Sequence, residues 1–181
     1  MIKLVFANGL NGEFGCPSGM PWPRNKQDMQ EFKKITTGQL VVMGNDTFKS
    51  LGSKPLPDRD NIVLTNSLPY EGIDFGREDV MFAKVHSDAF GAFLKHLDNS
   101  IEQDVCIIGG ASILIQALPY ADAVCQTYIR EVTEEATVKL PYKGFFEYLY
   151  DESTFARIQS KPSKDDSVVF NIYVPQVRGR F

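Results

Sequence analysis

Short apolar runs separated by turn residues dominate the hydrophobic pattern of this chain. They cover residues 2–7, 40–43, 62–64, 105–108 and 168–174. Most of these runs are continuous rather than alternating, which is typical of strands that are buried on both faces of a sheet. The pattern therefore predicts a sheet whose central strands are covered on both sides.

Helix-like segments separate these strands. They cover residues 26–36, 88–97 and 111–118, with Ser87 placed to cap the second segment and Pro119 ending the third. The first half of the chain thus predicts the order β-α-β-α-β.

The carboxyl-terminal part has a different pattern. A strand is expected over 123–132, and two more flank the turn-rich residues 162–166. Together the two parts predict a single-domain α/β fold: a mostly parallel twisted sheet with an antiparallel C-terminal hairpin and flanking helices. No composition shift divides the chain, so we expect one domain over 1–176 and a frayed tail over 177–181.

Composition and charge narrow the function classes. With 181 residues, 43% apolar content and a net charge of -4, the chain can bury one core, and its scattered Lys and Arg residues argue against nucleic-acid binding. No apolar run approaches the roughly 18 residues of a membrane span, and the first residues resemble a strand rather than a signal peptide. The chain has three cysteines without C-x-x-C spacing, which predicts reduced thiols in a cytoplasmic protein. Its two histidines are not near a cysteine in the sequence, so we expect no metal site.

Residues 9–22 follow the first strand and are rich in glycine and proline. Four glycines and two prolines in this stretch predict a long mobile loop. In an open α/β sheet ligands bind at the carboxyl ends of the strands, so this segment is either a lid over a ligand or an ordinary surface loop.

Asp28 is the candidate chemical group of the first helix. It shares one helix face with Phe32 and Ile35, whereas Glu31 faces elsewhere. Helix physics alone favours a first-turn acid that points to solvent and is stabilised by the helix dipole. The alternative is a carboxylate at the mouth of an apolar pocket, holding an amidine-like heterocycle edge by two charge-assisted hydrogen bonds.

Two strand-to-helix turns contain glycine. Gly109-Gly110 ends one buried strand, and Met43-Gly44 ends another. Glycine lets the backbone approach a ligand closely, and the following helix amides suit a pyrophosphate, so the two turns together predict a dinucleotide cradle.

Several motifs, in this order and spacing, resemble dihydrofolate reductase over nearly the whole chain. They are Met20-Pro21-Trp22, Asp28 six residues later, Phe32, Val42-Met43-Gly44 with Thr47-Phe48, Pro55-Leu56-Pro57 with Arg59-Asp60-Asn61, and Ile107-Ile108-Gly109-Gly110. Residues 1–6 and 117–122 look most like phage-encoded members of the family.

The resemblance implies a pterin site with three catalytic residues. Asp28 would bind the ring nitrogen and 2-amino group and support protonation at N5, Thr127 would join it at the same ring edge, and Trp22 would order a nearby water. Arg59 would pair with the glutamate α-carboxylate of the substrate. The other substrate-binding residues would be the walls and floor of the pocket: Phe32, Leu56, Ile108, Val5, Phe6 and Ala7.

The resemblance also implies a cofactor site and a cis peptide between Gly109 and Gly110. Its members would be Ala7, Phe14, Gly15, Met20, Gly44, Asn45, Asp46, Thr47, Leu64, Thr65, Asn66, Ile108, Gly109, Gly110, Ala111, Ser112, Ile113 and Leu114. Asn45 and Ser112 stand where many members have basic residues, so NADPH is the expected cofactor and NADH stays open. Leu114 replaces a tyrosine often found beside the nicotinamide.

The expected function is reduction of 7,8-dihydrofolate to tetrahydrofolate by hydride transfer from NADPH, in support of one-carbon metabolism and thymidylate synthesis. The expected partner is this small-molecule substrate, with no nucleic acid or membrane, and the chain is expected to be a monomer. Two alternatives are a relative that reduces another pterin or a ribosylated pyrimidine, and a catalytically idle nucleotide-binding or assembly component. Retention of Asp28, Phe32, Arg59 and Thr127 together argues against idleness, because packing does not require that set.

Overall fold

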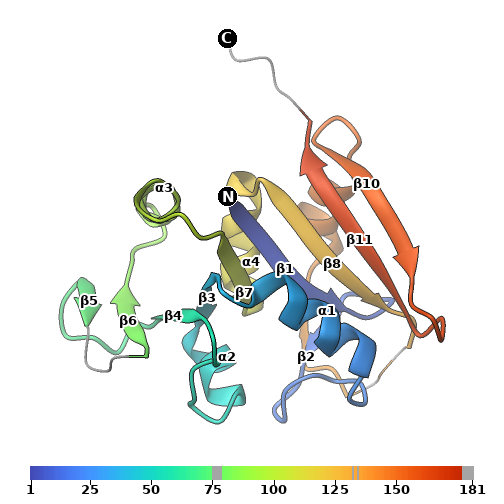
Figure 1. Cartoon of the computed structure of the whole chain (residues 1–181), viewed down its shortest axis with the longest axis horizontal. Coiled ribbons are helices and arrows are strands. Elements are labelled where there is room, and N and C mark those ends of the chain that lie inside the picture. Colours follow the sequence, from blue (N-terminus) through green and yellow to red (C-terminus); the bar gives the residue numbers. More distant parts are fainter. Residues whose placement is uncertain (75–78, 132, 134, 177–181) are drawn as a thin grey trace.

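The computed structural model describes residues 1–74, 79–131, 133 and 135–176. Within these residues the main sheet has the strand order β10-β11-β8-β1-β7-β3-β4-β6-β5 (Figure 1). The strands are β1 (Ile2–Asn8), β3 (Leu40–Gly44), β4 (Asp60–Leu64), β5 (Gly72–Asp74), β6 (Met81–Lys84), β7 (Val105–Gly109), β8 (Ala123–Ile129), β10 (Phe155–Pro162) and β11 (Val168–Pro175). The central strands pair in parallel, whereas β11 is antiparallel to both β8 and β10. The expected α/β fold with an antiparallel C-terminal hairpin is confirmed.

Helices cover both faces of this sheet. They are α1 (Lys26–Thr36), α2 (Asn45–Ser50), α3 (Phe90–Ser100), α4 (Ala111–Ala117) and α5 (Glu147–Tyr150). Alternate residues of β1 point to opposite faces, so Leu4 joins a core with α3, α4 and α5, while Val5 joins a second core with Phe32 and Ile35 of α1. Both cores explain why the central strands are continuously apolar. None of the described helices is long and apolar enough to cross a membrane.

Several element boundaries differ from the sequence prediction. Ser87 does not cap α3, because a turn forms in which the Phe90 N–H donates to the Ser87 carbonyl, and the cap position is Ala89. The strand expected over 123–132 ends at Ile129. A 3₁₀ turn that contains Pro119 follows α4, which ends at Ala117. The tail expected over 177–181 lies outside the described residues.

The glycine-rich loop contains a short strand that the sequence pattern did not indicate. β2 (Glu13–Gly15) pairs in antiparallel fashion with β9 (Val138–Lys139), forming a small second sheet. The two segments are more than 120 residues apart, and each is too short for a recognisable alternation. β2 therefore places the loop beside the carboxyl end of β1.

A buried amide centres a polar network on the face of β8 that packs against α5. Gln126 donates to Asn8 Oδ1 at 2.7 Å and to the Tyr150 hydroxyl at 2.9 Å, and its Oε1 accepts from Asn171 Nδ2 at 3.1 Å and from the Tyr173 hydroxyl at 3.3 Å. Because Asn8, Asn171 and Tyr173 are buried, Gln126 provides hydrogen bonds to groups that water does not reach.

We expect Gln126→Leu to lower the free energy of unfolding by about 2–4 kcal/mol, because the substitution leaves several buried polar groups without their partner. Urea denaturation measures this change. Gln159→Leu on β10 is the matched control, since Gln159 is exposed. Equal stability of the two variants would contradict the role given to this network.

Candidate active site

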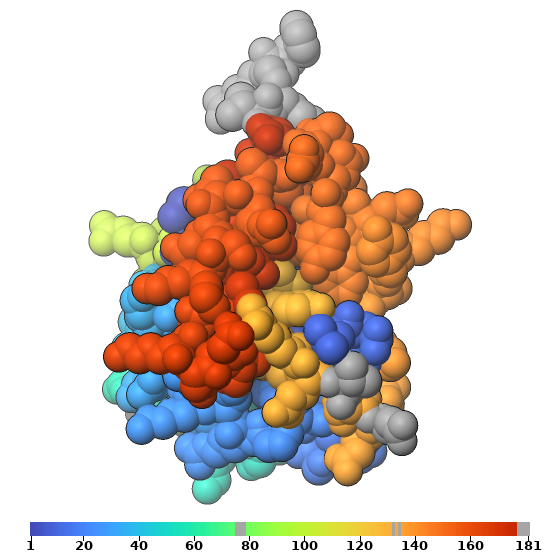
Figure 2. Space-filling model, turned by 90° about the vertical axis from the view of Figure 1, so that its right-hand side faces the viewer, coloured from blue at the N-terminus to red at the C-terminus, as the bar shows by residue number. Residues whose placement is uncertain are grey.

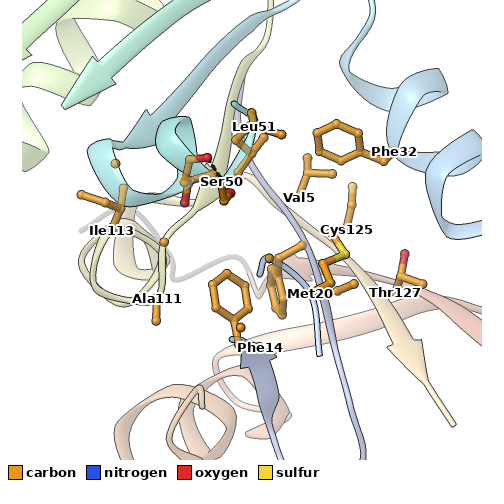
Figure 3. A pocket seen from close by; sticks show the side chains of 18 of the residues that line it. Val5, Phe14, Met20, Phe32, Ser50, Leu51, Ala111, Ile113, Cys125 and Thr127 are labelled. Atoms are coloured by element: carbon orange, nitrogen blue, oxygen red, sulfur yellow. Dashed lines mark hydrogen bonds between the residues drawn. The ribbon is translucent and has the colours of Figure 1, made fainter. Parts of the chain in front are cut away.

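A large cleft runs across the carboxyl ends of the central strands, between α1 on one side and the turns before α2 and α4 on the other. Its volume is about 2040 Å³. Side chains from β1, β2, α1, α4 and β8 point into it, as Figure 3 shows for Val5, Phe14, Phe32, Ala111 and Thr127.

Nearly all of the site residues expected from the sequence line this one cleft. They are Val5, Phe6, Ala7, Phe14, Gly15, Met20, Trp22, Asp28, Phe32, Gly44, Asn45, Asp46, Thr47, Leu56, Arg59, Leu64, Thr65, Asn66, Ile108, Gly110, Ala111, Ser112, Ile113 and Thr127. Gly109 and Leu114 are not among the lining residues. Leu114 is fully buried in the core under α4, so its side chain does not face the cleft.

Asp28 lies inside the cleft rather than in solvent. Asn25 caps α1 by accepting the N–H groups of Gln27 and Asp28, both at 3.0 Å, and itself donates to Ser167 at 2.9 Å. This cap sets the rotation of the first turn, and Asp28 is 6% exposed. The interpretation of Asp28 as a solvent-facing first-turn acid is therefore wrong.

The electrostatics of Asp28 follow from this burial. Burial raises the pKa of the Asp28 carboxyl to about 6, although hydrogen bonding with the Thr127 side chain partly offsets the shift. Thr127 reaches Asp28 from β8, which pairs with β1 in the register Ala7 to Thr127. A carboxyl group with a pKa of about 6 can both hold a cationic or donor-rich ring edge and exchange a proton near neutral pH.

We expect Asp28→Asn to stabilise the ligand-free protein above about pH 6 by about 1–3 kcal/mol. The folded-state pKa of about 6 lies above the ordinary value of 3.8, so ionisation at neutral pH costs stability that the neutral amide retains. Urea unfolding near pH 7.5 measures the gain, and the gain shrinks near pH 4.5 because Asp28 is then mostly protonated in the folded protein. A gain that does not depend on pH would contradict the burial of an ionisable Asp28.

Apolar side chains form the walls around Asp28. Phe32 lies one helical turn after it, and Leu56 and Ile108 belong to the same buried cluster as Phe32. Sequence reasoning missed Cys125, which lines the cleft beside Val5 and Thr127 (Figure 3). Because Cys125 lies two residues before Thr127 on β8, strand alternation was a signal that placed both on one face.

Arg59 stands at the outer end of these walls. Its guanidinium lies 5.9 Å from the centroid of the Phe32 ring, and its Nη2 donates to the Thr37 hydroxyl at 3.4 Å. Its Nε is buried and has no hydrogen-bond partner among the described residues. Asn61 fixes the turn, because its side chain accepts from the Leu56 N–H and donates to the carbonyls of Leu56 and Arg59. The arrangement leaves a guanidinium with free donors at the rim of an apolar pocket.

The two glycine turns meet on the other side of the cleft. A Cβ atom on Gly44 would lie 3.5 Å from the Gly110 nitrogen, and one on Gly109 would lie 3.2 Å from the Phe14 ring. The peptide between Gly109 and Gly110 is cis, as the resemblance implied. Thr47 adds a hydroxyl beside both glycines of this pair. The turns therefore bring the starts of α2 and α4 close together, which suits the phosphates of an extended dinucleotide.

Beyond these turns the cleft continues along the ends of β4 and β6. Leu64, Thr65 and Asn66 line it there, together with His86. Asn45 and Ser112, the two departures from the basic residues of many relatives, also face the cleft. No group of three metal-ligating side chains occurs within the ranges that the structure describes.

This geometry fits one class of protein: an α/β oxidoreductase with a long cleft that runs from a buried carboxylate to two glycine turns. The family model for dihydrofolate reductase matches residues 1–174. The chain belongs to the dihydrofolate reductase family. Membership supports NADPH-dependent reduction of dihydrofolate to tetrahydrofolate as its reaction.

Individual relatives agree with this assignment. The dihydrofolate reductase of Mycobacterium leprae is 37% identical over 124 residues, 67% of each chain, and that of Haemophilus influenzae is 35% identical over 129 residues, 71% of this chain and 72% of the relative. A bifunctional dihydrofolate reductase-thymidylate synthase of Paramecium tetraurelia is 37% identical over 117 residues, 65% of this chain, but the match spans only 23% of that protein. The structure of Enterococcus faecalis dihydrofolate reductase complexed with NADP(H) and RAB-propyl has a TM-score of 0.78 at 23% identity, covering 97% of this chain and 96% of the other.

Proposed function

We propose that this chain reduces 7,8-dihydrofolate to tetrahydrofolate at the Asp28 end of the cleft. The observation that carries the proposal is a buried carboxylate, 6% exposed, at the base of an apolar pocket that opens toward two glycine turns. Such a pocket accommodates a flat ring with hydrogen-bond donors on one edge. The product would supply one-carbon metabolism and thymidylate synthesis.

Asp28 and Thr127 hold the donor edge of the ring in this mechanism. The pocket walls formed by Phe32, Leu56 and Ile108 orient the ring and exclude water, which strengthens the interaction with the carboxylate. The chemistry that NADPH would supply when bound is a hydride, which the ring carbon C6 would accept. The neighbouring N5 gains a proton, with water as the proximate donor, and Asp28 supports this protonation through the ring.

Arg59 binds the far end of the substrate in this proposal. Its guanidinium lines the cleft and suits a carboxylate, because this planar group can make two parallel hydrogen bonds. The substrate then extends along α1 from Asp28 to Arg59. This placement separates ring recognition from tail recognition.

The cofactor would be held by the other half of the cleft. The amides around Gly44 and Gly110 and the hydroxyl of Thr47 would hold its phosphates, while Thr65 and Asn66 would face its adenosine half. Ala7, Phe14 and Met20 would contact its nicotinamide half. NADPH is the expected donor, and NADH is the alternative favoured by Asn45 and Ser112.

We infer that the chain acts as a cytoplasmic monomer on a small molecule, without nucleic acid or membrane. We also propose that it is most similar to phage-encoded members of the family, on the basis of residues 1–6 and 117–122.

The test is dihydrofolate-dependent oxidation of NADPH and of NADH by the purified chain. Turnover of dihydrofolate supports the proposal. Turnover of a ribosylated pyrimidine in place of dihydrofolate would assign the chain to another reductase class. Binding of NADPH without any turnover would favour an idle nucleotide-binding component.

A further inference from the structure

Glu13 is a buried carboxylate that the proposed mechanism does not use. It is 1% exposed, although it lies in the short strand β2 of the glycine-rich loop. Its Oε2 accepts the Asn11 N–H at 2.7 Å, and Lys139 Nζ lies 3.7 Å from its Oε1. Burial opposes ionisation of Glu13, but the backbone amides of Asn11 and Glu13, with Lys139, keep the pKa of its carboxyl below the ordinary value. The loop is thus built around an ionised, fully enclosed carboxylate.

Close backbone packing fixes the loop on either side of Glu13. Gly9 donates its N–H to the Glu13 carbonyl at 2.8 Å, and a Cβ atom on Gly9 would lie 2.6 Å from Glu13 Oε2. Gly12 has a φ of 79°, and its carbonyl accepts the Leu140 N–H at 2.8 Å. In Figure 2 the blue segment that follows β1 lies on the surface against the yellow-orange chain near the end of β8. The carboxylate therefore fills the interior of a turn that has no room for another side chain.

The residue after Glu13 points the other way, into the cleft. Phe14 lines the cleft beside Met20 and Ala111 (Figure 3). Its ring approaches Gly109, where an added Cβ would lie 3.2 Å from Cζ. Because adjacent residues of a strand point to opposite sides, anchoring Glu13 below β2 sets the position of Phe14 above it.

We propose that Glu13 is a positioning residue for cofactor binding: its enclosed carboxylate joins β2 to β9 and holds Phe14 against the Gly109–Gly110 turn. The proposal rests on the assignment of this half of the cleft to the cofactor. It predicts a selective effect. Loss of the carboxylate loosens the cofactor half, while the pocket formed by α1 and β8 for the ring keeps its geometry.

Two substitutions at Glu13 separate charge from hydrogen bonding. Glu13→Leu removes both, whereas Glu13→Gln keeps a carbonyl oxygen for the Asn11 N–H and loses the charge that faces Lys139. NADPH affinity is measured by quenching of the fluorescence of Trp22, the single tryptophan of the chain. We expect NADPH to bind about tenfold more weakly to Glu13→Leu than to wild type, and Glu13→Gln to show a smaller loss of affinity. The KM for dihydrofolate should stay within about twofold of wild type in both variants. Glu152→Gln, at an exposed position, serves as the control and keeps the wild-type affinity.

Gly9→Ala tests the same contact without changing Glu13. Its added methyl group displaces the carboxylate, so the variant should show the same selective weakening of NADPH binding. Two results would each overturn the proposal. One is an unchanged NADPH affinity in the variants that fold. The other is that the binding of NADPH and of dihydrofolate weakens equally, in proportion to a lower melting temperature of the variant. Turnover of dihydrofolate by the wild type tests the proposed function separately. If the wild type does not reduce dihydrofolate, the proposed function is wrong, but the NADPH affinities of the variants still decide the role of Glu13.

Discussion

Asp28→Asn is expected to lower kcat/KM for dihydrofolate by about 10²–10³-fold at neutral pH. The amide cannot carry the negative charge that holds the donor edge of the ring, and its NH₂ group faces donors rather than acceptors. It also cannot support protonation at N5. The steady-state rate of NADPH oxidation with saturating cofactor measures the change.

The matched control for this variant is another first-turn acid. Glu147→Gln in α5 makes the same chemical change at an exposed position and should retain wild-type activity. Because Asp28→Asn is also expected to be the more stable protein at neutral pH, a loss of activity cannot be attributed to unfolding. An Asn variant as fast as wild type at neutral pH would remove Asp28 from the mechanism.

Arg59→Leu is expected to raise the KM for dihydrofolate by about 10²-fold, because the substrate carboxylate loses its charge-assisted hydrogen bonds. The KM for NADPH should not change, since Arg59 lies at the opposite end of the cleft from the glycine turns. Both constants come from initial rates with one substrate varied at a time.

A truncated substrate sharpens this test. Dihydropteroate lacks the glutamate, so wild type and Arg59→Leu should use it about equally well. Arg157→Leu on the exposed edge strand β10 removes the same charge elsewhere and should leave both constants unchanged. If Arg59→Leu raises the KM for dihydropteroate as much as the KM for dihydrofolate, Arg59 acts by supporting the pocket walls and not by binding the substrate carboxylate.

The central elements of the fold could be predicted because each has a strong local pattern. α1 begins and ends where its sequence indicates, and the continuous apolar runs of β1, β3 and β7 correspond to strands with a core on either face. β5 and β6 escaped prediction, since strands of three and four residues at the sheet edge show too little alternation. The pairing of β2 with β9 depends on contacts between distant segments, which no local pattern encodes.

The site residues likewise divide into those that a local pattern indicates and those that contacts between distant segments place. Helix physics alone favoured a solvent-facing Asp28. Its burial instead depends on long-range features: the cap at Asn25, which is hydrogen-bonded to Ser167, and the approach of Thr127 from β8. Leu114 was assigned to the cofactor site by position in the family motif, but α4 turns that side chain toward the core with Ala117. The burial of Glu13 had no sequence signal, because a glutamate in a glycine-rich loop ordinarily faces solvent.

The most direct test of the account is the pH dependence of single-turnover NADPH oxidation in wild type and Asp28→Asn. If a carboxyl group with a pKa of about 6 supports protonation of the ring, the wild-type rate constant levels off at low pH and falls as the pH rises above about 6. The Asn variant should start lower and keep increasing as the pH falls, because solvent protonation replaces the missing carboxyl group. Parallel profiles with the same apparent pKa in both proteins would contradict the account.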